Sequence, residues 1–168
     1  MKQRVIGIAG YKNASKTTLT INLVKEFISR GFKVSTVKHA HHNFDIDHPG
    51  RDSYRHREAG AHEVAIVTKH RWALLHELRT EDEPDMDEML GKLEPCDLVV
   101  IEGYRHGPIP KIEALNTELD HPRLAGNDEN IIAVATNGPL DGEPVPAFDR
   151  DNISAIADLV AEVTGLGK

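Results

Sequence analysis

Short apolar runs recur along the chain between polar turns, and this pattern predicts strands buried in a sheet. The most continuous runs are residues 5–9, 98–101 and 131–135, and two further strands are predicted at residues 33–38 and 111–115. Apolar residues three or four positions apart predict helices near residues 17–30, 85–93 and 153–163, and a short helix ends at Gly60. The alternation of strands and helices along the chain predicts an α/β fold, namely a three-layer sandwich with a mostly parallel sheet flanked by helices.

One pair of strands differs from this plan. Residues 62–68 and 72–78 both read as strands, and only Lys69-His70-Arg71 separates them. So short a connection predicts an added β-hairpin. Trp72 at its turn is expected to be a core residue or a subunit-interface residue.

Length and composition limit the number of domains, the kinds of partner and the cellular compartment. The chain has 168 residues, 39% of them hydrophobic and 28% charged, which predicts one well-packed domain spanning residues 1–168. The formal net charge of −7 argues against a nucleic-acid partner. A single cysteine fits a reducing compartment, and neither a membrane-spanning run nor a signal peptide is visible, so a cytoplasmic protein is expected.

The stretch after the first strand carries the strongest chemical signal. It leads from a strand into a helix, as a phosphate-binding loop requires, and it matches the pattern G-x-x-x-x-G-K-[ST] at all fixed positions except one. The predicted phosphate-binding residues are Gly10, Tyr11, Lys12, Asn13, Ala14, Ser15, Lys16, Thr17 and Thr18. In such a loop Lys16 reaches the β- and γ-phosphates of a nucleotide, and the hydroxyl of Thr17 ligates Mg²⁺.

The exception is Ser15, which stands where the pattern has its second glycine. If the loop needs a left-handed backbone there, a residue with a Cβ costs about 1–2 kcal/mol. The side chain would also crowd the phosphate. The loop is therefore expected to form but to bind nucleotide less tightly than a glycine-containing one.

A second signal follows the buried strand at residues 98–101. Glu102 stands at its carboxyl end, where P-loop proteins hold the carboxylate that organises Mg²⁺. Glu102 is predicted to bind the metal through water or to polarise an attacking water, which makes Glu102 and Lys16 the catalytic candidates. Arg105, three residues after Glu102, is a candidate to contact a phosphate or an anionic partner.

A polar loop at residues 38–50 leaves the carboxyl end of another strand, and in open α/β sheets that edge faces the ligand. His39, His41 and His42 are potential ligands of a transition metal, whereas Asp45 suits Mg²⁺. The spacing matches no defined zinc signature, so the alternative is a solvated loop that contacts a nucleotide or a partner through individual residues.

With these motifs in place, the chain resembles the MobB family of molybdopterin-guanine dinucleotide biosynthesis adapter proteins. The resemblance extends over nearly the whole chain. It rests on Gly10–Asn13 with Lys16–Thr18, on Lys38–Tyr54 with Ala59–Ala61, and on Leu98–Arg105. The middle stretch is the most specific, because generic P-loop proteins lack it.

The resemblance implies a P-loop NTPase-like fold, a homodimer, GTP binding with Mg²⁺, and at most weak GTPase activity. It implies that the partner is the guanylyltransferase that joins GMP to molybdopterin, with molybdopterin itself as a further ligand. By position it places Thr17, Asp45 and Glu102 around the metal, and His39 and Arg105 near the nucleotide. The guanine preference rests on the resemblance alone, because no N-K-x-D motif is present.

Two other functions stay open from the residues. A small-molecule kinase would use the same loop with Glu102 or Arg105, although no arginine-rich lid is visible. A metallochaperone GTPase would use the histidines at positions 39, 41, 42 and 48. Metal titration and partner binding distinguish these from the adapter.

Overall fold

The structure, a computed structural model, describes residues 3–40 and 44–167. Its internal contacts divide the chain into two compact units, Met1–His39 with Met86–Lys168, and Ala40–Asp85. The expectation of one domain over the whole chain stays a prediction, and each unit is described by itself. Within the described ranges, no helix is both long enough and apolar enough to cross a membrane.

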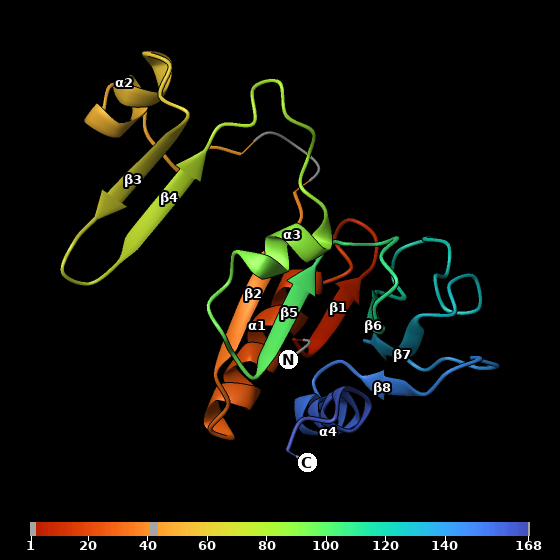
Figure 1. Cartoon of the computed structure of the whole chain (residues 1–168). Coiled ribbons are helices and arrows are strands. Elements are labelled where there is room, and N and C mark those ends of the chain that lie inside the picture. The colour runs from red at the N-terminus through yellow and green to blue at the C-terminus, as the bar shows by residue number, and fades with distance from the viewer. Residues whose placement is uncertain (1–2, 41–43, 168) are drawn as a thin grey trace. The chain divides into compact units, whose positions relative to one another are not determined.

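The larger unit is built on a six-stranded sheet in the order β2-β5-β1-β6-β7-β8 (Figure 1). Its strands are β1 (Val5–Ala9), β2 (Val34–Lys38), β5 (Leu98–Glu102), β6 (Lys111–Leu115), β7 (Ile131–Thr136) and β8 (Ala147–Asp149). Each neighbouring pair is parallel. The predicted α/β fold is therefore confirmed. The short strand β8 was missed, since three residues after a proline-containing turn show no clear period.

Helices cover this sheet because their apolar stripes match its buried face. α1 (Lys16–Ser29) and α4 (Ile153–Thr164) pack against each other and against β1, and Phe27 and Ile156 are completely buried between them and the strands. α3 (Met86–Gly91) lies on the near side of β5 in Figure 1, with α1 behind the sheet. All three helices occur within two residues of their predicted ends.

Residues 116–130 also cover the sheet, although their sequence predicts only a polar loop. Leu124 and Ala125 are buried there and pack with Ala9 and Val134. The carboxylate of Glu113 in β6 accepts their backbone N–H groups at 3.0 and 2.8 Å. The buried carboxylate of Glu113 therefore holds this segment on the sheet, although the segment forms no helix.

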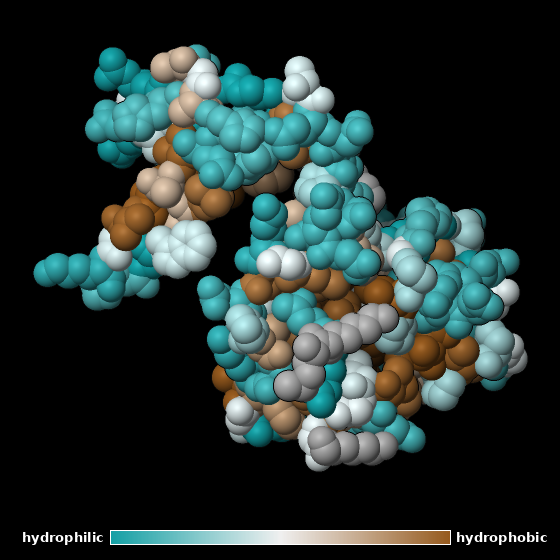
Figure 2. All heavy atoms as spheres, in the orientation of Figure 1, coloured by the Kyte–Doolittle hydropathy of each residue, from teal (hydrophilic) through white to brown (hydrophobic). Residues whose placement is uncertain are grey.

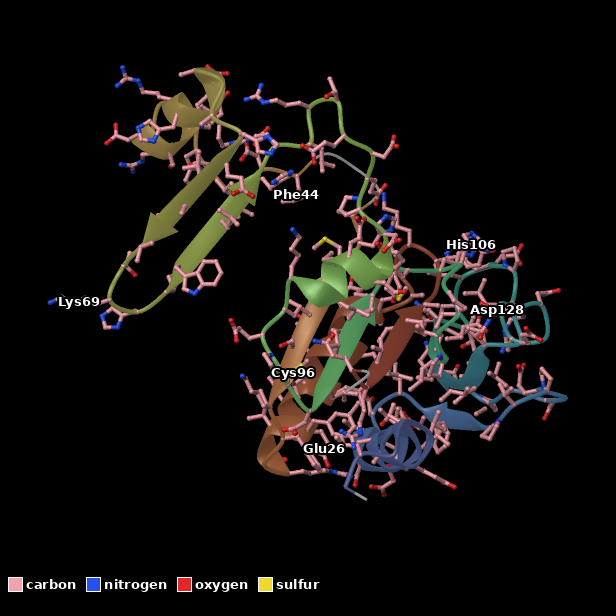
Figure 3. All side chains as sticks on the ribbon, viewed as in Figure 1. Glu26, Phe44, Lys69, Cys96, His106 and Asp128 are labelled. Atoms are coloured by element: carbon pink, nitrogen blue, oxygen red, sulfur yellow. The ribbon has the colours of Figure 1, made fainter. Side chains whose placement is uncertain are left out.

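The smaller unit contains α2 (Asp52–Glu58) and the antiparallel strands β3 (Glu63–Val67) and β4 (Trp72–His76). The predicted hairpin is confirmed, and Lys69 lies in its turn (Figure 3). Val64 is buried on the strand that packs against α2. Trp72 is 66% exposed, so the expectation that it is a core residue is wrong and the interface alternative remains.

Candidate functional site

The strand β1 ends directly in the predicted phosphate loop, and Gly10 makes the sharp exit possible. Gly10 has φ of 145°, and a Cβ added to it would lie 2.5 Å from the carbonyl oxygen of Ala114 in β6. Real Cβ atoms essentially never approach so closely, so glycine is required here for space as well as for conformation. The neighbouring strand thus fixes where the loop begins.

Ser15 closes the loop and opens α1. Its backbone is left-handed, with φ of 67° and ψ of 23°, which confirms that this position favours glycine. Asn13 in the same loop is also left-handed, with φ of 64°. The side chain of Ser15 does not cap the helix. It accepts a hydrogen bond of 3.3 Å from Nη1 of Arg150, a residue just after β8 that the sequence did not single out.

The start of α1 is suited to an anion. The first turn holds no acidic residue and receives no side-chain cap, so the helix dipole and the backbone N–H groups at this end favour a negative ligand. Lys16, the first helical residue, donates from Nζ to the carbonyl oxygen of Tyr11 at 2.7 Å, across the loop. Burial lowers the pKa of Lys16, the carboxylate of Glu102 opposes this shift, and Lys38 adds to it.

Thr17 and Glu102 meet at the carboxyl ends of β1 and β5. These strands are neighbours in register, with Ile8 beside Glu102. The hydroxyl of Thr17 donates to Oε1 of Glu102 at 2.7 Å, and Nζ of Lys38 lies 3.4 Å from the same oxygen. A hydroxyl and a carboxylate offer the hard oxygen ligands that Mg²⁺ prefers, so the donor set fits this ion.

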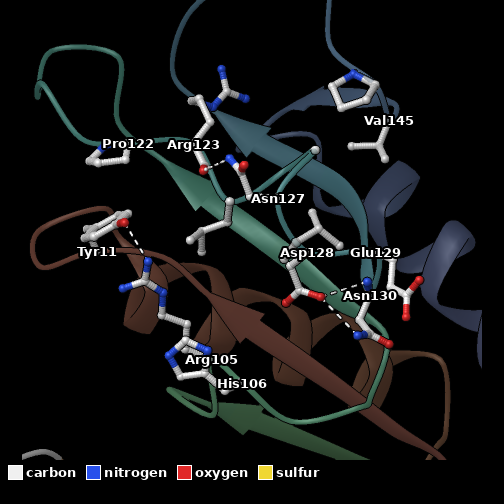
Figure 4. A pocket seen from close by; sticks show the side chains of 14 residues that line it. Tyr11, Arg105, His106, Pro122, Arg123, Asn127, Asp128, Glu129, Asn130 and Val145 are labelled. Carbon is white, nitrogen blue, oxygen red and sulfur yellow. Dashed lines mark hydrogen bonds between the residues drawn. The ribbon is translucent and has the colours of Figure 1, made fainter.

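Tyr11 is the centre of an aromatic and cationic cluster beside the loop. Nη2 of Arg105 donates to its hydroxyl at 2.6 Å, and the guanidinium lies 4.4 Å from the ring centroid (Figure 4). The ring of His121 stacks on Tyr11 with a centroid distance of 5.0 Å and also contacts the carbonyl of Lys12 at 3.1 Å. Segments on either side of the loop therefore hold its tip.

A pocket of about 910 Å³ adjoins this cluster (Figure 4). Tyr11 and Arg105 line one side, and residues of the 116–130 segment, among them Arg123 and Asp128, line the other. Asp128 forms an ion pair of 2.8 Å with the buried Lys111 of β6. The wall opposite Tyr11 is thus attached to the sheet by a charge pair.

Four predicted site residues lie in the larger unit, around the loop that follows β1. They are Lys16, Thr17, Glu102 and Arg105. His39 is there as well, since its backbone N–H donates to the carbonyl of Glu102 at 2.9 Å and its ring lies 4.6 Å from that of Tyr104. These side chains are therefore neighbours in the fold, and their roles toward a nucleotide or a metal stay predictions.

Asp45 belongs to the smaller unit. Its carboxylate accepts hydrogen bonds from Arg57 at 2.9 Å and from the backbone N–H of Asp47 at 2.9 Å. The Asp47 N–H and then the Arg57 guanidinium hold the pKa of Asp45 below its usual value. Its role as a metal ligand stays a prediction, and His41 and His42 lie outside the described residues.

Sequence reasoning missed four polar residues that shape this region. They are Lys111, Glu113, His121 and Arg150. Lys111 and Glu113 are each 1% exposed, and their alternation within the run Lys-Ile-Glu-Ala-Leu was the available signal that one face of this strand carries buried charge. Nothing local marks His121 or Arg150, because their partners are remote in sequence.

A parallel sheet flanked by helices, with a strand, a glycine-initiated loop and a helix at its centre, defines a P-loop NTPase-like α/β protein. Within that class the chain belongs to the MobB family, because residues 5–137 match the family model described as molybdopterin guanine dinucleotide synthesis protein B.

Named relatives agree with the family. The chain is 39% identical to the molybdopterin-guanine dinucleotide biosynthesis adapter protein of Haemophilus influenzae over 158 residues, covering 93% of this chain and 86% of the relative. It is 34% identical to the protein of the same name from Escherichia coli, over 94% and 91% of the two chains. A crystal structure of a MobB homolog from Bacillus stearothermophilus superposes with a TM-score of 0.71 at 25% identity, over 97% and 99% of the chains.

Proposed function

We propose that this protein is an adapter in the biosynthesis of the molybdopterin guanine dinucleotide form of the molybdenum cofactor. In this role it binds GTP with Mg²⁺, hydrolyses it weakly at most, and assists the guanylyltransferase that joins GMP to molybdopterin. The names of the related proteins support the pathway. The loop geometry supports the nucleotide.

The observation that carries the nucleotide role is the hydrogen bond of 2.7 Å between Thr17 and Glu102. It joins the first turn of α1 to the end of β5, two places that are 85 residues apart in sequence. Lys16 lies beside this pair with a pKa that burial lowers and Glu102 raises. A triphosphate on the loop would meet Lys16, and Thr17 with Glu102 would hold Mg²⁺, which supplies charge neutralisation at the phosphates.

Calorimetric titration of GTP with Mg²⁺ tests the site. We expect the native chain to bind, and Lys16→Ala to weaken binding by at least tenfold because the loop loses its phosphate-facing cation. Lys25→Ala is the matched control, since it removes an exposed lysine from the same helix. Equal affinities in all three proteins would refute the assignment of this loop.

Nucleotide selectivity and turnover distinguish the adapter from a small-molecule kinase. The adapter predicts that GTP binds better than ATP, that hydrolysis is slow, and that the guanylyltransferase binds this chain in a two-protein titration. Rapid phosphoryl transfer to a metabolite, with no affinity for the guanylyltransferase, would favour the kinase instead.

The proposed homodimer has a candidate surface on the hairpin. Val67 and Trp72 are cross-strand neighbours, as are Ala65 and Leu74, so these side chains share one face, opposite that of Val64. Val67, Trp72 and Leu74 are 74%, 66% and 49% exposed. Figure 2 shows apolar residues at the surface of this hairpin. A contiguous exposed apolar face of this kind is typical of an interface, and a second copy of the chain would offer the same face.

Trp72 is the only tryptophan, so its emission reports directly on this surface. We expect the emission maximum to shift to shorter wavelength as the protein concentration rises and dimers form. Leu74→Asp should abolish the shift and give a monomer by light scattering, whereas Ile28→Asp, at a 57% exposed position on α1, should leave the dimer intact. A native chain that stays monomeric, or a dimer unaffected by Leu74→Asp, would refute this surface.

A further inference from the structure

We infer that the smaller unit carries a divalent transition-metal site formed by His62, His76 and Glu81. These three residues each offer one ligand atom, and all three atoms lie within 4.8 Å of one another. The inference is independent of the nucleotide site, because its residues all belong to the unit Ala40–Asp85.

The hairpin places the two histidines together. His76 ends β4 and is in register with Glu63, the first residue of β3, so His62 immediately precedes this pair. The backbone N–H of Glu77 donates to the carbonyl of His62 at 3.1 Å, which extends the pairing to that residue. The two imidazole rings meet edge to face, with centroids 4.5 Å apart.

A turn after β4 delivers the carboxylate. Arg79 has a left-handed backbone with φ of 49°, and the N–H of Glu81 donates to the carbonyl of Leu78. The guanidinium of Arg79 donates to the carbonyls of Arg57 at 3.3 Å and Ala61 at 3.1 Å, which ties the turn to the region between α2 and β3. The strained backbone thus brings Glu81 back over His76.

The distances are close to those of a coordination sphere. Oε2 of Glu81 lies 3.0 Å from Nε2 of His76, and Oε1 lies 3.5 Å from Nε2 of His62. Ligands of a tetrahedral Zn²⁺ with bond lengths of about 2.0–2.2 Å lie roughly 3.3–3.6 Å apart. The three ligand atoms lie within 4.8 Å of one another, so the side chains have to move closer together to direct one oxygen and both nitrogens at a single ion. The exposed side chains of His62 and Glu81 have room for this movement.

A second carboxylate prepares His76 for this role. Nδ1 of His76 is 2.8 Å from Oε1 of Glu63. Nε2 of the same ring also lies at hydrogen-bond distance, 3.0 Å, from Oε2 of Glu81. An ion would take the place of the Nε2 proton between the ring and Glu81, while Nδ1 keeps its hydrogen bond to Glu63, as in the carboxylate–histidine–metal arrangement of many zinc sites. Glu63 therefore acts as a positioning residue rather than as a ligand.

The donor set indicates the kind of ion. Two imidazoles and one carboxylate suit Zn²⁺ or a neighbouring first-row metal better than Mg²⁺ or Ca²⁺, which prefer oxygen. The three ligands leave one position of a tetrahedral ion for water or for a donor from another molecule. The side chains of His62 and Glu81 are 59% and 48% exposed, so such a donor has access.

Titration of the full chain with Zn²⁺ by calorimetry and with Co²⁺ by visible absorption tests the inference. We expect one ion per chain and the intense absorption of four-coordinate Co²⁺. His76→Ala and Glu81→Gln should each weaken binding at least tenfold, and Glu63→Gln should weaken it about 10–100-fold while leaving all three ligands in place.

Two controls separate this site from other histidines. His70→Ala removes an exposed histidine from the turn of the same hairpin, and the double variant His41→Ala, His42→Ala removes those of the preceding loop. Both should bind like the native chain. Absence of binding by the native chain, or loss in the double variant with retention in Glu81→Gln, would overturn the inference. Circular dichroism of each metal-free variant establishes that it is folded, and Glu81→Gln, at an exposed position, serves if His76→Ala fails to fold.

Discussion

Ser15 holds a left-handed backbone that costs a residue with a Cβ about 1–2 kcal/mol, and its hydroxyl accepts a hydrogen bond of 3.3 Å from Arg150. Replacing it by glycine removes both the strain and the hydroxyl, whereas replacing it by alanine removes only the hydroxyl. The comparison of Ser15→Gly with Ser15→Ala therefore isolates the backbone strain, because both variants lose the bond to Arg150.

The expected magnitude follows from these two contributions. A long, partly buried hydrogen bond contributes about 0.5 kcal/mol, so Ser15→Ala should be slightly less stable than the native chain. Glycine relieves the strain but adds entropy to the unfolded chain, so Ser15→Gly should exceed Ser15→Ala in free energy of unfolding by about 1 kcal/mol. For a chain of this size, that difference corresponds to roughly 2–4 °C in melting temperature.

Urea unfolding followed by far-ultraviolet circular dichroism measures the difference, with calorimetry as a second readout. Fluorescence is unsuitable, because Trp72 belongs to the other unit. If Ser15→Ala proved as stable as Ser15→Gly, the backbone at this position would not be strained, and the expected weakening of phosphate binding would rest only on crowding by the side chain.

Three further outcomes are expected. In urea unfolding, Gly10→Ala should destabilise the chain by about 2–5 kcal/mol through steric overlap and strain. Gly31→Ala is the control, also at positive φ but in open space, and should cost only about 1 kcal/mol. Equal costs would contradict the close approach of Gly10 to β6. Glu113→Ala should lower the free energy of unfolding by about 2–4 kcal/mol and accelerate hydrogen exchange at the backbone N–H groups of Leu124 and Ala125. Unchanged exchange would contradict the role of Glu113 in holding this segment on the sheet. Glu102→Gln should lower the pKa of Lys16 further, because Glu102 raises it, and an NMR titration of the lysine side chain showing a rise would contradict the electrostatic coupling.

The order of strands and helices along the chain was predictable because β1, β5 and β7 are continuous apolar runs and α1, α3 and α4 each have an apolar stripe. The strand β8 was not predictable. Ala147–Asp149 is only three residues long, and it is recognised as a strand through its pairing with β7. The packed segment that carries Leu124 looked like a loop, because a buried carboxylate rather than an apolar period fixes it.

For the site, the motif predicted the loop, and the position of Glu102 after a buried strand predicted a carboxylate near the metal that Thr17 was expected to bind. The direct hydrogen bond between the two side chains was not predicted. The hydrogen bond from Arg150 to Ser15 was beyond reach, since those residues are 135 positions apart and neither forms part of a spaced motif. The cluster of His62, His76 and Glu81 also escaped notice, because strand register and a left-handed turn bring its members together.

The place of β1 in the sheet has a kinetic consequence. β1 leaves the ribosome before the other strands of this sheet, yet its partners are β5 and β6, which are synthesised about a hundred residues later. A parallel central strand with such distant partners makes folding slow, since long loops must close before the contacts form. The loop at Gly10–Thr18 therefore reaches its folded position only after residue 115 has emerged, and a shorter nascent chain exposes an apolar strand and lacks the partners of this loop.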